Sequence, residues 1–454
     1  MMKAAAHLSK QESGDLKPIC PEAIASRKVL LIAYHFPPQM GSSGHLRTLK
    51  YCRYLPEHGW DPAVLTAHPR AYEQVDSSQL VEIPPQIKVI RAFALDARKH
   101  LSLRGRYFRW TALPDRWLAW CLGAVPAGTF HIYKNKPQVI LTTFPIASAV
   151  MVGYLLHRIT GIPWVAEFRD SMTEDDYPPD PQTRRALRWL EKKAVQHASR
   201  LIFTARSALK MYLQRYPELS AAKCLVISNG YDESDFSGLT QLHSQSRNAR
   251  VRLHHSGLIY PVERDPVPFF TALSRLKKEG TLNASCFSVD LRASGDEEHY
   301  RKIAAQLEIE DLVHFLPALP YRQALQDSNQ ADILLLLQAA CCDHQIPAKA
   351  YEYLRLRKPI LALTSHTGDT AALLAECGGA TIVDISDQEA IYRVLPQVLA
   401  AVRAGTHPLP RMEVVQKYSR QNQACDLAHC LGQIVEDERI TAAASAAKRS
   451  ETAL

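Results

Sequence analysis

The segment Cys342–Leu363, CDHQIPAKAYEYLRLRKPILAL, reads as a helix followed by a buried strand. The aliphatic run DILLLL at 332–337 precedes it, and PILAL at 359–363 closes it. Two apolar runs joined by a segment of helix length predict a crossover between parallel strands. Ligands of such sheets bind beyond the carboxyl ends of the strands, so residues 341–348 should line a binding crevice.

The start of this predicted helix favours an anion. Pro347 suits the first helical turn, and the free N–H groups beside it point towards a bound phosphate. Lys349 and Glu352 share one helix face, where the cation can meet a diphosphate and the carboxylate a pair of sugar hydroxyls. A solvated ion pair is the alternative explanation of that spacing. The order of strand, polar loop, Lys, Glu and second strand favours the ligand site.

The stretch IPAKAYEYLRLRKPILAL resembles the donor-nucleotide segment of retaining glycosyltransferases of family 4, which have the GT-B fold. The resemblance implies that Glu352 hydrogen-bonds the ribose of a sugar nucleotide. Many family members carry another glutamate eight residues earlier, near the donor sugar, and this sequence has His344 there. His344 is therefore the candidate residue on the donor-sugar side.

Length and composition fit a globular protein of two domains. The 454 residues are 46% hydrophobic and 22% charged, enough for two cores of about 200 residues each. The net charge of +8 suits anionic ligands or an anionic membrane face, whereas the 46 acidic residues argue against nucleic acid as a partner. Ten cysteines without a CxxC pair predict neither a disulfide framework nor a zinc site, and indicate the cytoplasm. We find no signal-peptide core at 1–26 and no apolar run long enough to span a membrane.

Alternating strand and helix signals predict an α/β protein with two Rossmann-like domains and a cleft between them. The expected parts are a flexible leader at 1–26, an N-terminal domain at 27–235, a linker at 236–249 and a C-terminal domain at 250–405. By the resemblance, the first domain binds the acceptor and the second the donor nucleotide. The resemblance also implies that a helix at 411–437 crosses back onto the first domain. The tail at 440–454 is expected to be disordered.

The loop after the first predicted strand, YHFPPQMGSSG at 34–44, lacks the GxGxxG spacing of a dinucleotide site. Gly41, Ser42 and Gly44 would let the backbone approach a ligand, although an ordinary turn has the same composition. The loop resembles the PPxxGG loop of family 4. That resemblance implies that the loop faces the donor phosphates and the acceptor, and makes Arg47 a candidate phosphate contact.

Another candidate follows a strand predicted at 163–168. The sequence EFRD at 167–170 resembles the DFRDPW of one family 4 subgroup, which makes Asp170 a candidate polar group near the acceptor. A structural pair between Asp170 and Arg169 is the alternative.

The second domain supplies a further phosphate motif. SGLIYPVERDP at 256–266 resembles the family pattern GxLxxxRDP. The resemblance implies that Ser256 and Gly257 bring backbone close to the phosphates and that Arg264 pairs with them, as a guanidinium holds two oxygens at once. An ion pair at a helix start is the alternative for Arg264. Ala318 lies in the loop 317–320 after another predicted strand, where a nucleotide base would rest, and residues 310–319 resemble the family segment LxDxVxFLGxV.

The stretch from Arg98 to Trp120 mixes arginines with aromatic residues, as an interfacial helix on an anionic membrane does. A helix packed on its own domain, with its arginines turned outward, is the alternative.

These motifs together predict a glycosyltransferase that moves a sugar from a nucleotide-sugar donor to a glycan or lipid-linked acceptor. The resemblance implies retention at the anomeric carbon and a role in polysaccharide or glycoconjugate synthesis at the inner membrane face. No Asp-x-Asp lies at a strand end, so we expect neither a metal nor another cofactor, with Arg264 and Lys349 stabilising the leaving diphosphate. A GT-B sugar-nucleotide epimerase and a non-catalytic nucleotide-sugar or glycan-binding protein remain alternatives.

Overall fold

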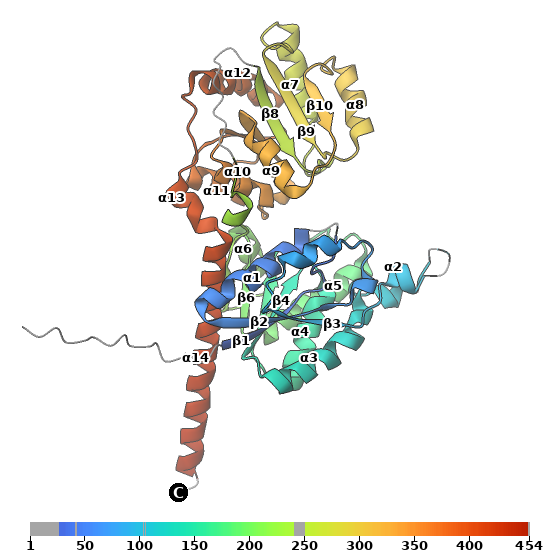
Figure 1. The fold of residues 1–454 in the computed structure, drawn as a ribbon, viewed down its shortest axis with the longest axis vertical. Coiled ribbons are helices and arrows are strands. Elements are labelled where there is room, and N and C mark those ends of the chain that lie inside the picture. The colour runs from blue at the N-terminus through green and yellow to red at the C-terminus, as the bar shows by residue number, and fades with distance from the viewer. Residues whose placement is uncertain (1–26, 41–42, 103, 105, 240–249, 453–454) are drawn as a thin grey trace, which may run out of the picture.

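The computed structural model describes residues 27–452 except 41–42, 103, 105 and 240–249. Two parallel sheets divide this part of the chain into two halves, which lie one above the other in Figure 1. The predicted leader at 1–26 and most of the predicted linker, 240–249, lie outside the described residues.

The first half holds a seven-stranded sheet in the order β3-β2-β1-β4-β5-β6-β7, with every neighbouring pair parallel. Its strands are β1 Arg27–Ile32, β2 Trp60–Ala67, β3 Lys88–Ala92, β4 Val139–Phe144, β5 Trp164–Phe168, β6 Arg200–Phe203 and β7 Cys224–Val226. Its helices are α1 Leu46–Tyr54, α2 Ala97–His100, α3 Cys121–Asn135, α4 Ala147–Thr160, α5 Pro181–His197 and α6 Arg206–Arg215. The strand order reverses between β1 and β4, which opens a crevice at the carboxyl ends of these two strands.

The second half holds a six-stranded parallel sheet in the order β10-β9-β8-β11-β12-β13. Its strands are β8 Val251–Ser256, β9 Phe287–Arg292, β10 Val313–Leu316, β11 Ile333–Gln338, β12 Ile360–Thr364 and β13 Ala380–Val383. Its helices are α7 Val267–Lys278, α8 Glu297–Gln306, α9 Tyr321–Asn329, α10 Ala348–Leu356, α11 Asp369–Cys377, α12 Gln388–Ala404 and α13 Met412–Val415. The order reverses between β8 and β11, the two strands that precede the predicted phosphate motifs.

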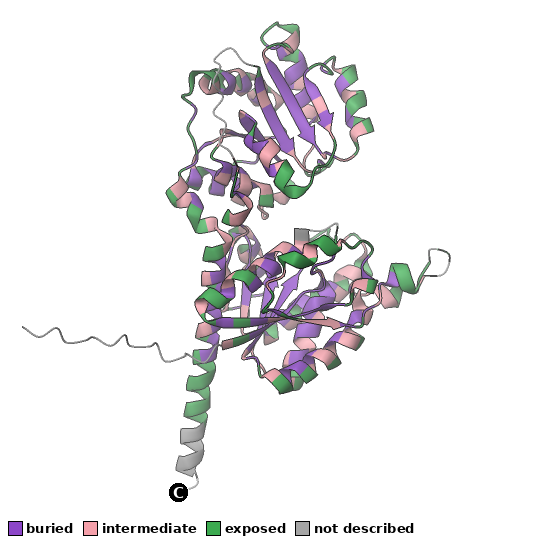
Figure 2. Cartoon of the chain, in the orientation of Figure 1, coloured by how far each residue is buried: buried purple, intermediate pink, exposed green. Residues whose placement is uncertain are grey.

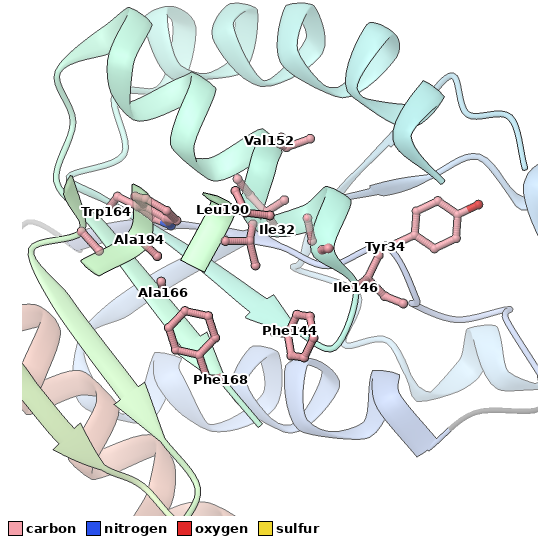
Figure 3. Packing of buried hydrophobic residues seen from close by; sticks show 14 of the residues in the cluster. Ile32, Tyr34, Phe144, Ile146, Val152, Trp164, Ala166, Phe168, Leu190 and Ala194 are labelled. Carbon is pink, nitrogen blue, oxygen red and sulfur yellow. The ribbon is translucent and has the colours of Figure 1, made fainter. Parts of the chain in front are cut away.

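The apolar runs of the sequence form the centres of both sheets because helices cover both of their faces. Every residue of β4, β5, β9, β11 and β12 is buried, and Figure 2 shows these strands in purple. In the first half, Phe168 on β5 and Phe144 on β4 pack in one cluster with Leu190 of α5 (Figure 3). Burying one such large apolar side chain contributes about 1.5–3 kcal/mol, so these clusters fix the strand ends that carry the site.

The C-terminal helix α14, Arg420–Thr452, returns to the first half and runs along its side in Figure 1. Leu427, Leu431 and Ile434 on α14 pack in one cluster with Val29 of β1. At the crossing, Tyr231 donates its N–H to the Tyr418 carbonyl, and Arg420 donates its N–H to the Tyr231 carbonyl. The predicted crossover helix is therefore present.

Two details of the C-terminal prediction need correction. The helix expected at 411–437 is divided at Ser419, which has extended backbone between the turn 416–418 and α14. The tail expected to be disordered is helical as far as Thr452, because α14 continues through it. Its alanine-rich sequence, TAAASAAKRSET at 441–452, explains the continuation, since alanine has the highest intrinsic helix propensity.

The stretch from Arg98 to Trp120 is not one helix, contrary to the prediction. After α2, the described residues form short 3-10 turns at Arg109–Ala112 and Leu118–Trp120. Pro114 lacks a backbone N–H, and Asp115 accepts the N–H of Ser148, which holds this stretch against α4. Its aromatic residues are split between environments, because Trp120 is buried whereas Phe108 and Trp110 are 74% and 70% exposed.

Candidate functional site

The loop between β11 and α10 forms one wall of the candidate site. Gln338, the last residue of β11, donates its Nε2 to the carbonyls of Cys342 and Gln345, at 2.8 and 2.9 Å. These bonds hold the loop in place after the strand. Pro347 is the N-cap residue and α10 begins at Ala348, so the proline lies one position before the helical turn in which it was predicted.

Lys349 and Gly257 are adjacent, although 92 positions separate them in the sequence. Gly257 has φ +118°, and a Cβ added there would lie 2.8 Å from Nζ of Lys349. Nζ also lies 3.1 Å from Nε2 of His255, whose Nδ1 lies 2.9 Å from the Leu335 carbonyl oxygen. Because an ammonium group only donates, His255 accepts at Nε2 and donates from Nδ1. Burial lowers the pKa of His255 well below its usual value, which agrees with a neutral ring.

Lys349 loses its proton more readily than an exposed lysine does. Burial lowers the pKa of Lys349 to about 7, and the neighbouring Arg264 cation adds to that shift while Glu352 opposes it. Arg264 is half-buried, lies with its guanidinium 5.3 Å from the ring centre of Tyr260, and donates to the Leu258 carbonyl. Two cations of the second half are therefore close enough to repel each other, and a bound anion would relieve that repulsion.

Glu352 accepts a hydrogen bond of 2.7 Å from the hydroxyl of Tyr321. Burial raises the pKa of Glu352, while the Tyr321 hydroxyl and the Lys349 cation oppose the rise. Tyr321 begins α9, directly after the exposed loop that contains Ala318. The structure thus connects the predicted base-side loop with the predicted ribose carboxylate. No sequence motif pointed to Tyr321.

The structure brings together the predicted donor residues of the second half. Ser256 ends β8 and Gly257 follows it, and the Ser256 N–H donates to the hydroxyl of Tyr353 on α10. The same helix carries Lys349 and Glu352. These residues therefore come from the carboxyl end of β8 and the amino-terminal turns of α10, at the point where the strand order reverses.

Arg47 does not lie at the predicted phosphate site. Its side chain is 2% exposed and donates to Glu167 at 2.8 Å, and to the carbonyls of Ile227 and Ser228. Burial alone would raise the pKa of Glu167, but the cations of Arg47 and Arg169 hold it below the usual value. Arg47 is a structural residue because these partners already take up its guanidinium.

The loop that precedes α1 is only partly described. Gly41 and Ser42 lie outside the described residues. Gly44 accepts from the guanidinium of Arg169 through its carbonyl, at 2.8 Å. Arg169 also donates to the Phe144 carbonyl, so it links the loop after β1 to the end of β4.

Asp170 lines a cavity of about 1210 Å³ between the two halves. Its side chain is accessible from the cavity, yet burial raises its pKa, with the Arg169 cation opposing the rise. Across the cavity, His344 contacts Glu174 with 2.7 Å between Nε2 and Oε1. The hydrogen bond to Glu174 raises the pKa of His344. His344 and Asp170 therefore belong to opposite walls of one space.

Arg420, the first residue of α14, is a further cation near this site. Its guanidinium donates to Gln423 on the same helix. Burial raises the pKa values of both Glu352 and Tyr321, and the charge of Arg420 opposes that rise. Burial lowers the pKa of Arg420 to about 10, and repulsion from Arg47 adds to this. No sequence motif indicated Arg420, because its place in the site depends on where the crossover helix begins.

Within the described part of the chain, no three or more His, Cys, Asp or Glu residues form a group that could hold a metal ion. No helix among the same residues combines the length and apolar character needed to cross a membrane.

Residues 44–230 match the family described as glycosyl transferase 4-like domain. No curated protein matches the chain. Among solved structures, sucrose-phosphate synthase from Thermosynechococcus elongatus is 15% identical with a TM-score of 0.61, over 90% of this chain and 100% of that one. Anabaena HepE, in complex with UDP and glucose, is 15% identical with a TM-score of 0.59, over 90% and 100% of the two chains. An E. coli structure described as trehalose-6-phosphate bound with UDP-2-fluoro glucose is 12% identical with a TM-score of 0.59, over 89% and 99%. These similarities confirm the predicted fold of two Rossmann-like domains with a crossover helix.

Proposed function

We propose that the protein is a glycosyltransferase with a nucleotide-sugar donor, because residues 44–230 match the glycosyl transferase 4-like domain and the chain has the GT-B fold. The proposal includes transfer with retention to a glycan or lipid-linked acceptor, in the synthesis of a polysaccharide or glycoconjugate. UDP is the nucleotide to test first, because it is bound in the HepE structure.

One observation carries the proposal: Lys349, Arg264 and the backbone of Gly257 lie together. The carboxylate of Glu352, on the same helix as Lys349, lies beside them. In a nucleotide sugar, the diphosphate follows the donor sugar and the ribose follows the diphosphate. The two cations match the diphosphate, and Glu352 can accept from the ribose hydroxyls. Tyr321 would hold Glu352 in position until the donor arrives.

In the proposed reaction, the bond between the anomeric carbon and the diphosphate oxygen breaks. A bond between that carbon and an acceptor hydroxyl oxygen forms on the same face, and the hydroxyl proton leaves with the diphosphate. Lys349 and Arg264 would stabilise the charge that develops on the departing phosphate, as fixed cations do where no metal takes part. We therefore expect transfer to continue in the presence of a metal chelator.

Peripheral contact with an anionic membrane remains part of the proposal, and places the reaction at the cytoplasmic membrane face. Its support is the exposed pair Phe108 and Trp110, whose rings stack 6.3 Å apart beside the half-exposed Tyr107. Exposed aromatic rings flanked by arginines suit a headgroup layer. Sedimentation with anionic and neutral vesicles tests this, and a Phe108→Ser, Trp110→Ser variant should lose the anionic preference.

The deciding experiment first measures the affinity of the purified protein for UDP-glucose and related donors by calorimetry. It then measures the rate at which the protein slowly hydrolyses each donor. Glu352→Ala and Arg264→Ala should weaken donor binding about 10-fold or more, since a hydrogen bond to a charged group is worth about 1.5–3 kcal/mol. Glu298→Ala, an exposed carboxylate on α8, is the matched control and should behave as the native protein.

The outcomes separate the alternatives. A sugar with an inverted carbon, formed without any acceptor, would identify an epimerase. Donor binding without hydrolysis or transfer would indicate a binding protein. Unchanged donor affinity and rate in both Glu352→Ala and Arg264→Ala would reject the proposed site.

A further inference from the structure

The cavity between the halves offers more space than a donor sugar needs. Ligand pockets usually occupy about 300–1,000 Å³, whereas this cavity has about 1210 Å³. Residues after β5 line one side, and residues after β11, including Cys342 and His344, line the other. An acceptor can therefore bind beside the donor sugar.

The described wall of this cavity is strongly acidic. The carboxylates that line it are Asp115, Asp170, Glu174, Asp175, Asp176 and Glu263. The basic side chains among the same lining residues are already engaged, because Arg215 pairs with Glu191 at 2.9 Å and His344 pairs with Glu174. Asp175 and Asp176 are exposed, and their carboxylates form no ion pair among the described residues, although Arg184 donates to the Asp175 backbone carbonyl. The wall therefore carries a surplus of negative charge.

Ser171 adds a second, independent feature of the same wall. Its side chain is 5% exposed, and its Oγ has no hydrogen-bond partner among the described residues. Buried hydroxyls in proteins nearly always have a partner. Because Ser171 lines the cavity beside Asp170, a hydroxyl of a bound molecule would supply that partner.

The cleft thus separates its charges. The cations Lys349 and Arg264 lie on the second half, where a diphosphate would bind, whereas all the lining carboxylates except Glu263 belong to the first half. A carboxylate attracts sugar hydroxyls and ammonium groups and repels phosphate or carboxylate groups, so like charge excludes the wrong partner.

We infer that the acceptor group entering this cavity is an uncharged or amino-bearing sugar, and that sugars phosphorylated or carboxylated at that end are rejected. This inference rests on the proposed glycosyltransferase function. It narrows the acceptor class of the same site, from any glycan to one without negative charge at the point of transfer.

The test compares three probes that differ in charge: glucose, glucosamine and glucose 6-phosphate. Their binding is measured by saturation-transfer NMR on the full chain saturated with UDP, with donor binding recorded separately by calorimetry. We expect glucosamine to bind at least as tightly as glucose, and glucose 6-phosphate at least about 10-fold more weakly. Raising the salt concentration should reduce this difference, because salt screens the repulsion.

A charge-reversed variant, Asp175→Lys with Asp176→Lys, should bind glucose 6-phosphate more tightly than glucose. The matched control, Glu297→Lys with Glu298→Lys, makes the same change of charge on α8 and should keep the native order.

Each possible result either supports or overturns the inference. Native protein that binds glucose 6-phosphate as tightly as glucose overturns the inference, as does a charge reversal that leaves the order unchanged. The inference is also overturned if none of the three sugars gives a saturable signal while UDP is bound. Sugar discrimination without any UDP or UDP-glucose binding would instead refute the proposed function and leave the charge selection of the cavity standing.

Discussion

The Nζ atom of Lys349 lies 3.1 Å from Nε2 of His255, so a lysine cation rests on a neutral imidazole beside Gly257. The ring offers one lone pair but no negative charge. Lys349 therefore has a hydrogen-bond partner without a counter-ion there, and burial lowers its pKa to about 7. An anionic donor would provide the missing charge.

Donor affinity should fall as the pH rises through about 7. In the empty protein Lys349 loses its proton near this pH, whereas a bound diphosphate favours the charged form, so binding above pH 7 takes up a proton. Affinity for UDP-glucose, which has no phosphate that titrates in this range, should drop by up to about 10-fold per pH unit. Calorimetry in two buffers of different ionisation enthalpy measures the proton uptake. Lys349→Met should remove both effects, and a native affinity that is constant from pH 6 to 9 would contradict the assignment.

Gly257→Ala should weaken donor binding by displacing Lys349. The added Cβ would lie 2.8 Å from Nζ, at a position with φ +118° where a side chain is also strained. Gly280→Ala is the matched control, because Gly280 also has positive φ, +73°, but an added Cβ there meets nothing within 4 Å. Both variants should lose some stability in urea unfolding, and only Gly257→Ala should lose UDP-glucose affinity. Equal affinities in the two variants would show that the approach to Lys349 is unimportant.

Arg47→Met should destabilise the first half by about 3–5 kcal/mol, the usual cost of leaving one buried charge unpaired. Glu167 would remain buried with the hydroxyls of Tyr51 and Thr143 and the Arg169 cation nearby. The double variant Arg47→Met, Glu167→Leu should recover much of this loss, because neither charge then remains unpaired. Urea unfolding of the two single variants and the double variant measures the coupling. Additive losses would mean that the pair does not act as a unit.

The contact between His344 and Glu174 should make closure of the cleft depend on pH. Glu174 raises the folded-state pKa of His344 above 6.5, so the ionic contact is complete below pH 6.5 and is lost as the pH rises through that higher value. Small-angle scattering should therefore give a larger radius of gyration at pH 9 than at pH 6. Asp170 and Asp369 also act on His344, so Glu174→Gln is the appropriate comparison and should reduce the difference between the two pH values. A native radius that does not change with pH would exclude this contact as a closing force.

The strands could be predicted to within a few residues, because a parallel sheet buried on both faces leaves continuous aliphatic runs such as 332–337. The assignment of Gly257 and Lys349 to one diphosphate site came from the resemblance to family 4 and not from this rule. Their adjacency in the structure agrees with that assignment.

Other features depend on contacts that the local sequence does not encode. Arg47 was expected at a phosphate, yet its partner Glu167 lies 120 positions away on β5 and takes up its charge. Tyr321 and Arg420 reach the site from a helix start and from the crossover, and neither belongs to a motif. The stretch after Arg98 has the composition of an amphipathic helix, but Pro114 and the Asp115 contact to Ser148 divide it.

The paired backbone segments at Tyr231 and Ser419 have a mechanical consequence. The chain passes between the halves twice, and the two passages are fastened to each other by hydrogen bonds next to Gly230, where an added Cβ would clash with the Tyr418 carbonyl. Two connecting segments that are hydrogen-bonded to each other bend more readily than they twist. We therefore expect the two halves to rotate about a single hinge axis, so that donor and acceptor would approach each other along one path.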